Sequence, residues 1–264
     1  GGNSVAIGYN ALTAQNNDAA NYNTAVGASA GAAVTTGVNN TFIGGLAGDA
    51  TDDGANNVAV GKSALSANCS DSNTAIGSGA LNVTTASNNT AVGASAGAAV
   101  TTGTQNTLIG AIAGDALTNA DRNVAVGYNS LTADTLGSRS TAVGYAALFA
   151  SNFTTATDTY NTAVGFEAGA AITTGVNNTI VGGLAGDSLT DSDFNVAVGF
   201  GALTTDTLGS RSVAIGRTAL AAQNFTTATD TYNVAVGYAA GTAVTTGVNN
   251  TIVGGLAGDA ITTG

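Results

Sequence analysis

The residues best suited to chemistry in this chain are aspartates, which recur after Ala-Gly at Asp49, Asp115, Asp187 and Asp259. Further acids follow several of them, and carboxylate oxygens are the ligands that calcium prefers. The spacing is irregular, so solubilising acids in turns are the favoured interpretation and a calcium site is the alternative. The candidate calcium ligands are Asp49, Asp52, Asp53, Asp187, Asp191 and Asp193.

The other residue types exclude most kinds of catalysis. The chain has no histidine, so neither a Ser-His-Asp nor a Cys-His arrangement can form. Glu167 is the only glutamate, and no aspartate pair repeats in a pattern suited to hydrolysis of a polysaccharide. Cys69 is the single cysteine and lies in a predicted turn. The sequence therefore predicts no catalytic residue, no resident cofactor and no enzymatic activity.

Charge and hydropathy narrow the classes of partner. Sixteen acidic and five basic residues give a net charge of −11. This balance argues against nucleic acid, which is bound through clustered Lys and Arg. No apolar run approaches the roughly 20 residues of a membrane-spanning helix, so this segment is not expected to insert into a membrane.

The elements that position these residues form a tandem repeat. A glycine that closes the pattern Asn-Thr-Ala-Val-Gly recurs fifteen times, mostly at intervals of 17 residues. Periods this short are typical of solenoids. We therefore predict an all-β fold, a parallel β-solenoid or β-roll of about fifteen coils. The anchor glycines are Gly8, Gly27, Gly44, Gly61, Gly77, Gly93, Gly110, Gly127, Gly144, Gly165, Gly182, Gly199, Gly216, Gly237 and Gly254.

The residues before each anchor glycine predict a short strand. Val or Ile always precedes the glycine, and Thr or Val stands two residues earlier, as in Thr24-Ala25-Val26. Residues two apart in a strand share a face. We expect the Val/Ile face to point into the coil and the intervening residue, usually Ala, to point outward.

Asparagine stands four residues before the glycine in twelve coils, and serine replaces it in the other three. Amides stacked at the spacing of neighbouring strands can bond to one another along the axis. We predict a structural ladder of these side chains. Its members are Asn23, Asn40, Asn57, Asn73, Asn89, Asn106, Asn123, Asn161, Asn178, Asn195, Asn233 and Asn250.

A longer period groups the coils in fours. The fourth residue after the anchor glycine follows the order Leu, Gly, Gly, Leu along the whole chain, from Leu12 to Gly258. Near-verbatim copies, such as those beginning at Asn152 and Asn224, support duplication of a four-coil unit. We predict one continuous solenoid domain over 1–264, as a segment of a longer fibre or filament.

The third coil of each four-coil unit carries bulky apolar residues where other coils have Ala in mid-strand, and again two residues after the glycine. A bulky pair on a face of small residues would suit a contact between chains. The predicted oligomer interface comprises Phe42, Leu46, Leu108, Ile112, Ile180, Leu184, Ile252 and Leu256.

The longest excursions from the repeat are 149–160 and 221–232. Loops that recur along one edge could display aromatic side chains to a receptor or glycan, and packing of these rings against the coil edge is the alternative. The residues concerned are Phe153, Tyr160, Phe225 and Tyr232.

The segments Asn3-Ser-Val-Ala-Ile-Gly8 and Arg211-Ser-Val-Ala-Ile-Gly216 resemble the head repeat of trimeric autotransporter adhesins. Asn-Thr-Ala-Val-Gly followed by Ala-Leu or Ala-Gly is similar to repeats of phage tail-fibre proteins. The resemblance implies a left-handed β-roll, three chains around one axis, and display on a cell or virion surface for attachment. The repeat of 17 residues is longer than the usual adhesin head repeat.

These observations together predict a non-enzymatic, extracellular, structural or adhesive fibre protein, a rigid rod that presents loops for surface attachment. Its expected partner is itself, as a homotrimer or an end-to-end filament, with a cell-surface receptor or glycan as a second partner. The alternatives are a self-stacking filament subunit, a phage tail-fibre shaft, and an ice-binding solenoid. Ice binding is disfavoured here because the regular Thr column shares the predicted inward face.

Overall fold

A computed structural model describes residues 2–16 and 20–263 of the chain. The fold is an all-β parallel β-solenoid in which each coil adds one short strand, and the described residues contain no helix. This confirms the predicted fold class. The chain divides into two compact units, Gly1–Tyr128 and Asn129–Gly264.

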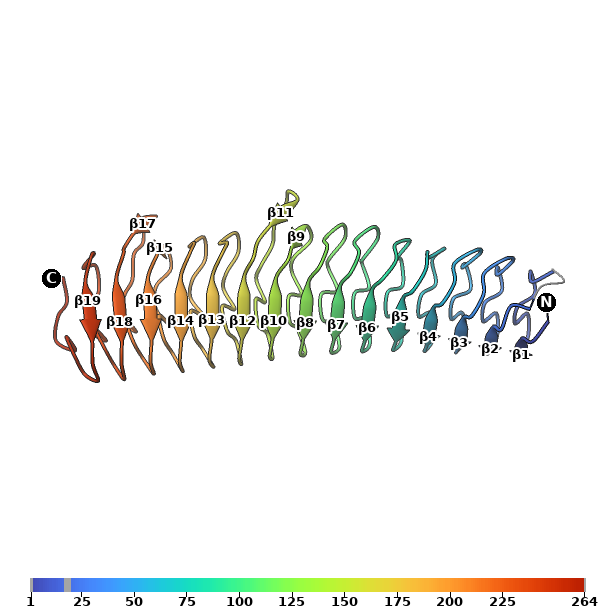
Figure 1. The fold of residues 1–264 in the computed structure, drawn as a ribbon, viewed down its shortest axis with the longest axis horizontal. Coiled ribbons are helices and arrows are strands. Elements are labelled where there is room, and N and C mark those ends of the chain that lie inside the picture. Colours follow the sequence, from blue (N-terminus) through green and yellow to red (C-terminus); the bar gives the residue numbers. More distant parts are fainter. Residues whose placement is uncertain (1, 17–19, 264) are drawn as a thin grey trace. The chain divides into compact units, whose positions relative to one another are not determined.

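The described part of the first unit holds three-residue strands that pair in parallel and in chain order, as Figure 1 shows in blue to green. Each strand ends at the residue before an anchor glycine, as the repeat predicted. The strands are β1 (Val5–Ile7), β2 (Thr24–Val26), β3 (Thr41–Ile43), β4 (Val58–Val60), β5 (Thr74–Ile76), β6 (Thr90–Val92), β7 (Thr107–Ile109) and β8 (Val124–Val126).

The second unit repeats this arrangement and adds two pairs of two-residue strands, each of which joins a long coil to the coil before it. The three-residue strands are β10 (Thr141–Val143), β12 (Thr162–Val164), β13 (Thr179–Val181), β14 (Val196–Val198), β16 (Val213–Ile215), β18 (Val234–Val236) and β19 (Thr251–Val253). The additional pairs are β9 (Gly137–Ser138) with β11 (Thr157–Asp158), and β15 (Gly209–Ser210) with β17 (Thr229–Asp230).

The anchor glycines allow successive coils to approach at strand spacing. The backbone at Gly44 has a φ of +132°, a region that L side chains rarely adopt. A Cβ atom added there would lie 2.6 Å from the carbonyl oxygen of Gly61, the anchor of the next coil. Any side chain at this position would therefore push the two coils apart.

In the three-residue strands from β2 onward, the middle residue points into the coil. Ala25 and Ala59 are fully buried, whereas the flanking Thr24 and Val26 are half-exposed and Ile43 is 40% exposed. The prediction that the Val/Ile face points inward is therefore wrong. A period of two shows which residues share a face, but it does not show which face is inside. The narrow interior of the coil has room mainly for Ala.

The four-coil period reflects the volume available in the core. Two successive coils carry glycine at the position where Leu65 fills the interior of its own coil, and Phe42 occupies the space that these glycines leave. A Cβ atom would lie 2.8 Å from the Phe42 ring if added at Gly31, and 2.5 Å if added at Gly48. Close packing of the interior thus couples the bulky residue to the two glycines. Leu108 and Ile252 likewise lie against two such glycines, and Ile180 lies against Gly186.

Candidate functional site

The most regular surface is the outer sheet face, which we define as the first and third residues of the three-residue strands. Within each unit these residues form two parallel columns, since each strand pairs in register with the next, as in Thr24↔Thr41 and Val26↔Ile43. Every residue in the two columns is Thr, Val or Ile. The third position is the more apolar, with Ile43, Ile76 and Ile109 each about 40% exposed.

The structure separates the residues of the predicted oligomer interface. Phe42, Leu108, Ile180 and Ile252 are buried core residues and take no part in a surface contact, which corrects that part of the prediction. Their partners in the predicted pairs lie nearer the surface. Leu46 and Leu256 are exposed, and Ile112 and Leu184 are half-buried. Because the middle residue of each strand was predicted to point outward, the interface was assigned to the strand centres instead of to the first and third residues.

The ladder asparagines bond from coil to coil. In the second unit, the Asn178 N–H donates to Oδ1 of Asn161 at 2.9 Å, and the Asn195 N–H donates to Oδ1 of Asn178 at 2.9 Å. Most of the amide nitrogens also donate to a turn carbonyl, as Asn178 Nδ2 does to Ser192 O at 2.7 Å. Apart from Asn250, which is half-buried, the predicted ladder asparagines are buried, so these bonds satisfy backbone groups that water does not reach.

Two buried aspartates organise the long coils, and the sequence reading missed both. Asp206 is fully buried, and its Oδ1 accepts the N–H groups of Gly209 at 3.1 Å and Phe225 at 2.9 Å. Its Oδ2 accepts a hydrogen bond from the Gln223 amide at 2.5 Å. Asp134 makes the equivalent backbone bonds one duplication earlier. The signal was present as Asp-Thr-Leu-Gly in both copies, a sequence suited to a turn closed by the Asp side chain.

The predicted display residues divide into two kinds. Phe153 and Phe225 are buried beside these aspartates, at 5% and 7% exposure, so they are not displayed and that part of the prediction is wrong. Tyr160 and Tyr232 are exposed and lie beside arginines. The buried rings cover the coil interior, because the longer excursion leaves apolar space that a Phe side chain fills.

The exposed tyrosines belong to two matching clusters in the second unit. Arg139 Nε lies 2.7 Å from Asp158 Oδ1, and the guanidinium lies 5.7 Å from the centre of the Tyr160 ring. In the later copy Arg211 pairs with Asp230 at 2.9 Å, and its guanidinium lies 4.8 Å from the centre of the Phe194 ring and 6.0 Å from that of Tyr232. Each cluster thus holds a guanidinium against both a carboxylate and an aromatic ring.

The candidate calcium ligands do not converge on a site. Several accept hydrogen bonds from the neighbouring coil: Asp191 Oδ1 from the Thr174 hydroxyl at 2.6 Å, and Asp193 Oδ1 from the Val176 N–H at 2.7 Å. Asp187 and Asp52 likewise accept from threonine hydroxyls. Asp49 is half-buried and Asp53 is exposed. Within the described residues, no three His, Cys, Asp or Glu side chains lie together as a metal site.

Cys69 lies in the interior with 1% exposure, and its Sγ is 3.3 Å from Thr51 Oγ1. Burial raises the pKa of the Cys69 thiol to about 11. The thiolate is the reactive form of cysteine, so this side chain is inert at neutral pH. Cys69 therefore acts as a small core residue and lies deeper than the sequence reading placed it.

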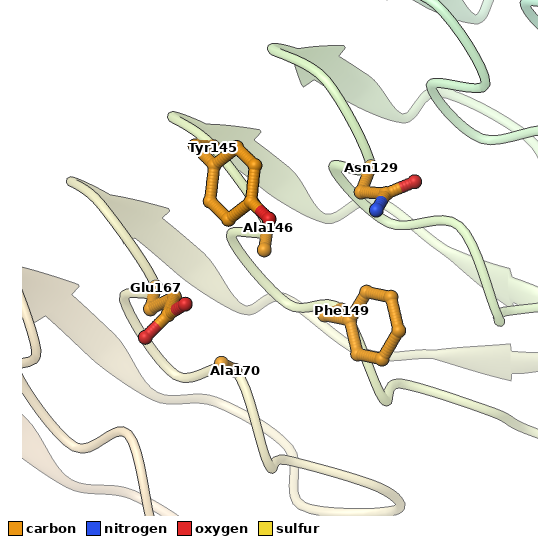
Figure 2. A pocket seen from close by; sticks show the side chains of 6 residues that line it. All are labelled: Asn129, Tyr145, Ala146, Phe149, Glu167 and Ala170. Carbon is orange, nitrogen blue, oxygen red and sulfur yellow. The ribbon is translucent and has the colours of Figure 1, made fainter.

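A hollow of about 210 Å³ opens on the surface of the second unit around Ala146. Figure 2 shows Tyr145, Phe149, Glu167 and Asn129 arranged around it. Tyr145 and Phe149 are 47% and 43% exposed, and Tyr145 stacks on Phe166 with ring centres 5.2 Å apart. The side chains come from successive coils, so sequence spacing alone did not reveal the site.

No helix in the described part of the chain is long and apolar enough to cross a membrane. Comparison of the chain with models of protein families, with curated proteins and with solved structures finds no match.

Proposed function

We propose that this chain is a non-enzymatic structural protein that associates with copies of itself through the outer sheet face, as part of an extracellular fibre. The observation that carries the proposal is the composition of that face. Both of its columns consist of Thr, Val and Ile, so no charged residue lies in either column. A sheet face in permanent contact with water normally carries polar and charged side chains.

The size of the face supports an interaction surface. Neighbouring strands lie about 4.8 Å apart, so the eight strands of the first unit carry the two columns over roughly 34 Å. Within it, Ile43, Ile76 and Ile109 repeat as exposed apolar residues along one line. Contiguous apolar patches of this kind mark interaction sites in soluble proteins.

The regularity of the face favours a second copy of the chain as the occupant. A partner must present side chains at the same spacing if it is to pack row against row. A copy of this solenoid has that spacing by construction, and its face is equally uncharged. Shape complementarity at the level of a protein interior then follows from β-branched side chains that interdigitate.

The resemblance of Asn3–Gly8 and Arg211–Gly216 to adhesin head repeats supports an extracellular fibre or adhesive role. In those adhesins three chains share one axis. The duplicated four-coil unit supports a function that depends on repetition, because repeated contacts raise the avidity of attachment without new chemistry. A phage tail-fibre shaft and an end-to-end filament are variants of the same structural role.

Replacing Ile76 and Ile109 by aspartate tests this function. Burying either carboxylate in an apolar contact without a partner is unfavourable, so we expect the double variant to sediment as a monomer of 25.2 kDa while the unchanged chain sediments as a multiple of that mass. Val83→Asp is the control, because Val83 is 40% exposed and lies outside the outer sheet face. The proposal fails if the unchanged chain is monomeric at all concentrations, or if the double variant and the control have the same mass.

Ice binding is a second candidate function, and one observation favours it. The reason for discounting it was an inward Thr column, whereas Thr24, Thr41 and Thr90 lie on the outer sheet face. An uncharged sheet with hydroxyl and methyl groups at regular spacing could match a lattice of water. Thermal hysteresis measured on the unchanged chain distinguishes ice binding from self-association, because self-association predicts none.

A further inference from the structure

We propose that the hollow around Ala146 binds an organic cation, an alkylammonium or guanidinium group carried by a partner molecule. The site lies within the second unit and does not depend on self-association through the outer sheet face. Its lining combines two exposed aromatic side chains, Tyr145 and Phe149, with the carboxylate of Glu167 and the amide of Asn129. A carboxylate beside aromatic rings is a favourable environment for a positive charge.

The charge of the lining is unbalanced. Glu167 is the only glutamate of the chain, and the ion pairs of the described residues involve Asp158 and Asp230 but not Glu167. The chain as a whole carries a net charge of −11, which adds a long-range attraction for cations and a repulsion for anions. A cationic ligand is therefore favoured over an anionic one.

The chain supplies its own examples of the arrangement. Arg139 pairs with the Asp158 carboxylate and lies near the Tyr160 ring, and Arg211 pairs with the Asp230 carboxylate and lies near aromatic rings. Both clusters contain the components found in the hollow, with the guanidinium included. At the hollow the carboxylate and the rings belong to the chain, and the cation would come from the ligand.

The duplicated copy 72 residues further along shows what replaces this lining. Tyr145 corresponds to Arg217, which lies 5.7 Å from the ring centre of Tyr238 and 6.0 Å from that of Phe200. The guanidinium of Arg217 also donates to the Tyr238 hydroxyl at 3.3 Å. In this later copy the chain supplies its own cation, Arg217, to the aromatic rings, and no acidic residue stands at the position that corresponds to Glu167.

The remaining lining positions also differ between the copies, although the flanking sequence is nearly identical. The lining residues Asn129, Ala146, Phe149, Glu167 and Ala170 correspond to Gly201, Thr218, Ala221, Ala239 and Thr242. The coils fold with either set, so folding does not require the aromatic and acidic lining. The aromatic and acidic side chains of the lining can thus serve to recognise a ligand.

Titration of the whole chain with n-butylammonium and with methylguanidinium, followed by NMR, tests the proposal. We expect both cations to perturb the resonances of Tyr145 and Phe149, and neutral n-butanol to bind at least several-fold more weakly. Glu167→Gln should lower the affinity for the cations about tenfold, equivalent to losing one partly exposed charge contact. Phe149→Leu should lower it several-fold while it keeps apolar bulk.

Asp191→Asn is the control, because it removes an exposed carboxylate outside the hollow and should leave the affinity unchanged. Equal binding of n-butanol and n-butylammonium would overturn the proposal, as would unchanged affinity in Glu167→Gln. A lysine- or arginine-containing peptide and a glucosamine oligomer then distinguish a protein source of the cation from an amino-sugar source. Sedimentation of Glu167→Gln should match that of the unchanged chain, which separates this site from the proposed self-association.

Discussion

Replacing Gly44 by alanine is expected to destabilise the first unit by about 3 kcal/mol or more. The new Cβ atom would lie 2.6 Å from the Gly61 carbonyl oxygen and 2.7 Å from its carbon, on a backbone with a φ of +132°. Both obstacles are backbone, so no side-chain rotation can relieve them, and a strained backbone conformation alone costs about 1–3 kcal/mol. Thermal and chemical denaturation followed by circular dichroism measure the loss.

The adjacent Gly45 is a matched control. The nearest atom to a Cβ added at Gly45 would be the carbonyl oxygen of Ala28, at 3.9 Å. Gly45→Ala should therefore change the free energy of unfolding by at most about 0.5 kcal/mol, as expected for a surface substitution. Equal stability of the two variants would show that the coils are not held at the close spacing described.

Replacing Asp206 by alanine is expected to cost about 3 kcal/mol or more in the second unit. The substitution leaves the N–H groups of Gly209 and Phe225 buried without their acceptor and removes one of the two acceptors of the Gln223 amide. Each buried polar group left unsatisfied costs about 1–3 kcal/mol. Urea denaturation of the variant measures the effect, and protection of the Phe225 amide from hydrogen exchange should be lost first.

Asp230→Ala provides the comparison for Asp206. Asp230 is exposed and pairs with Arg211 at the surface, an interaction worth at most about 1 kcal/mol. If both substitutions destabilise the chain to the same small extent, the carboxylate of Asp206 is not the organising group of the long coil. Asp206→Asn should be intermediate, because an amide can still accept from the backbone but presents a second donor to Gln223.

The sequence predicted the solenoid because its strongest signals are local and periodic. An anchor glycine and a β-branched residue before it recur with each coil, and the strands end where that pattern places them, as at Val26 and Val198. The asparagine positions were also evident from their spacing. Such features depend only on coil-to-coil neighbours, which the repeat itself brings together.

The repeat pattern alone does not show which face of each strand points into the coil. In Thr24-Ala25-Val26 both faces are small and uncharged, so polarity did not distinguish inside from outside. The informative pattern was the coupling of Phe42 to Gly31 and Gly48, which indicates exchange of volume in one interior. Bulky residues that replace Ala only where glycines make room are core residues.

The hollow and the buried aspartates were not predicted from the sequence for a different reason. Asp206 accepts hydrogen bonds from Gln223 and Phe225 of the next coil, and Glu167 and Phe149 line the hollow from neighbouring coils. These contacts depend on how the excursions fold back, which no short period encodes. The arginine clusters on Tyr160 and Tyr232 have the same origin.

Thiol labelling as a function of protein concentration tests most directly that the outer sheet face is outward and self-associates. Thr90→Cys places a thiol on that face and Ala91→Cys places one inside, while Cys69 stays neutral because burial raises its pKa to about 11. We predict that a maleimide labels Thr90→Cys rapidly in dilute solution and slowly in concentrated solution, and that Ala91→Cys is unreactive in both. A rate for Thr90→Cys that does not change with concentration would show that this face does not self-associate, and rapid labelling of Ala91→Cys would show that the middle residue does not point inward.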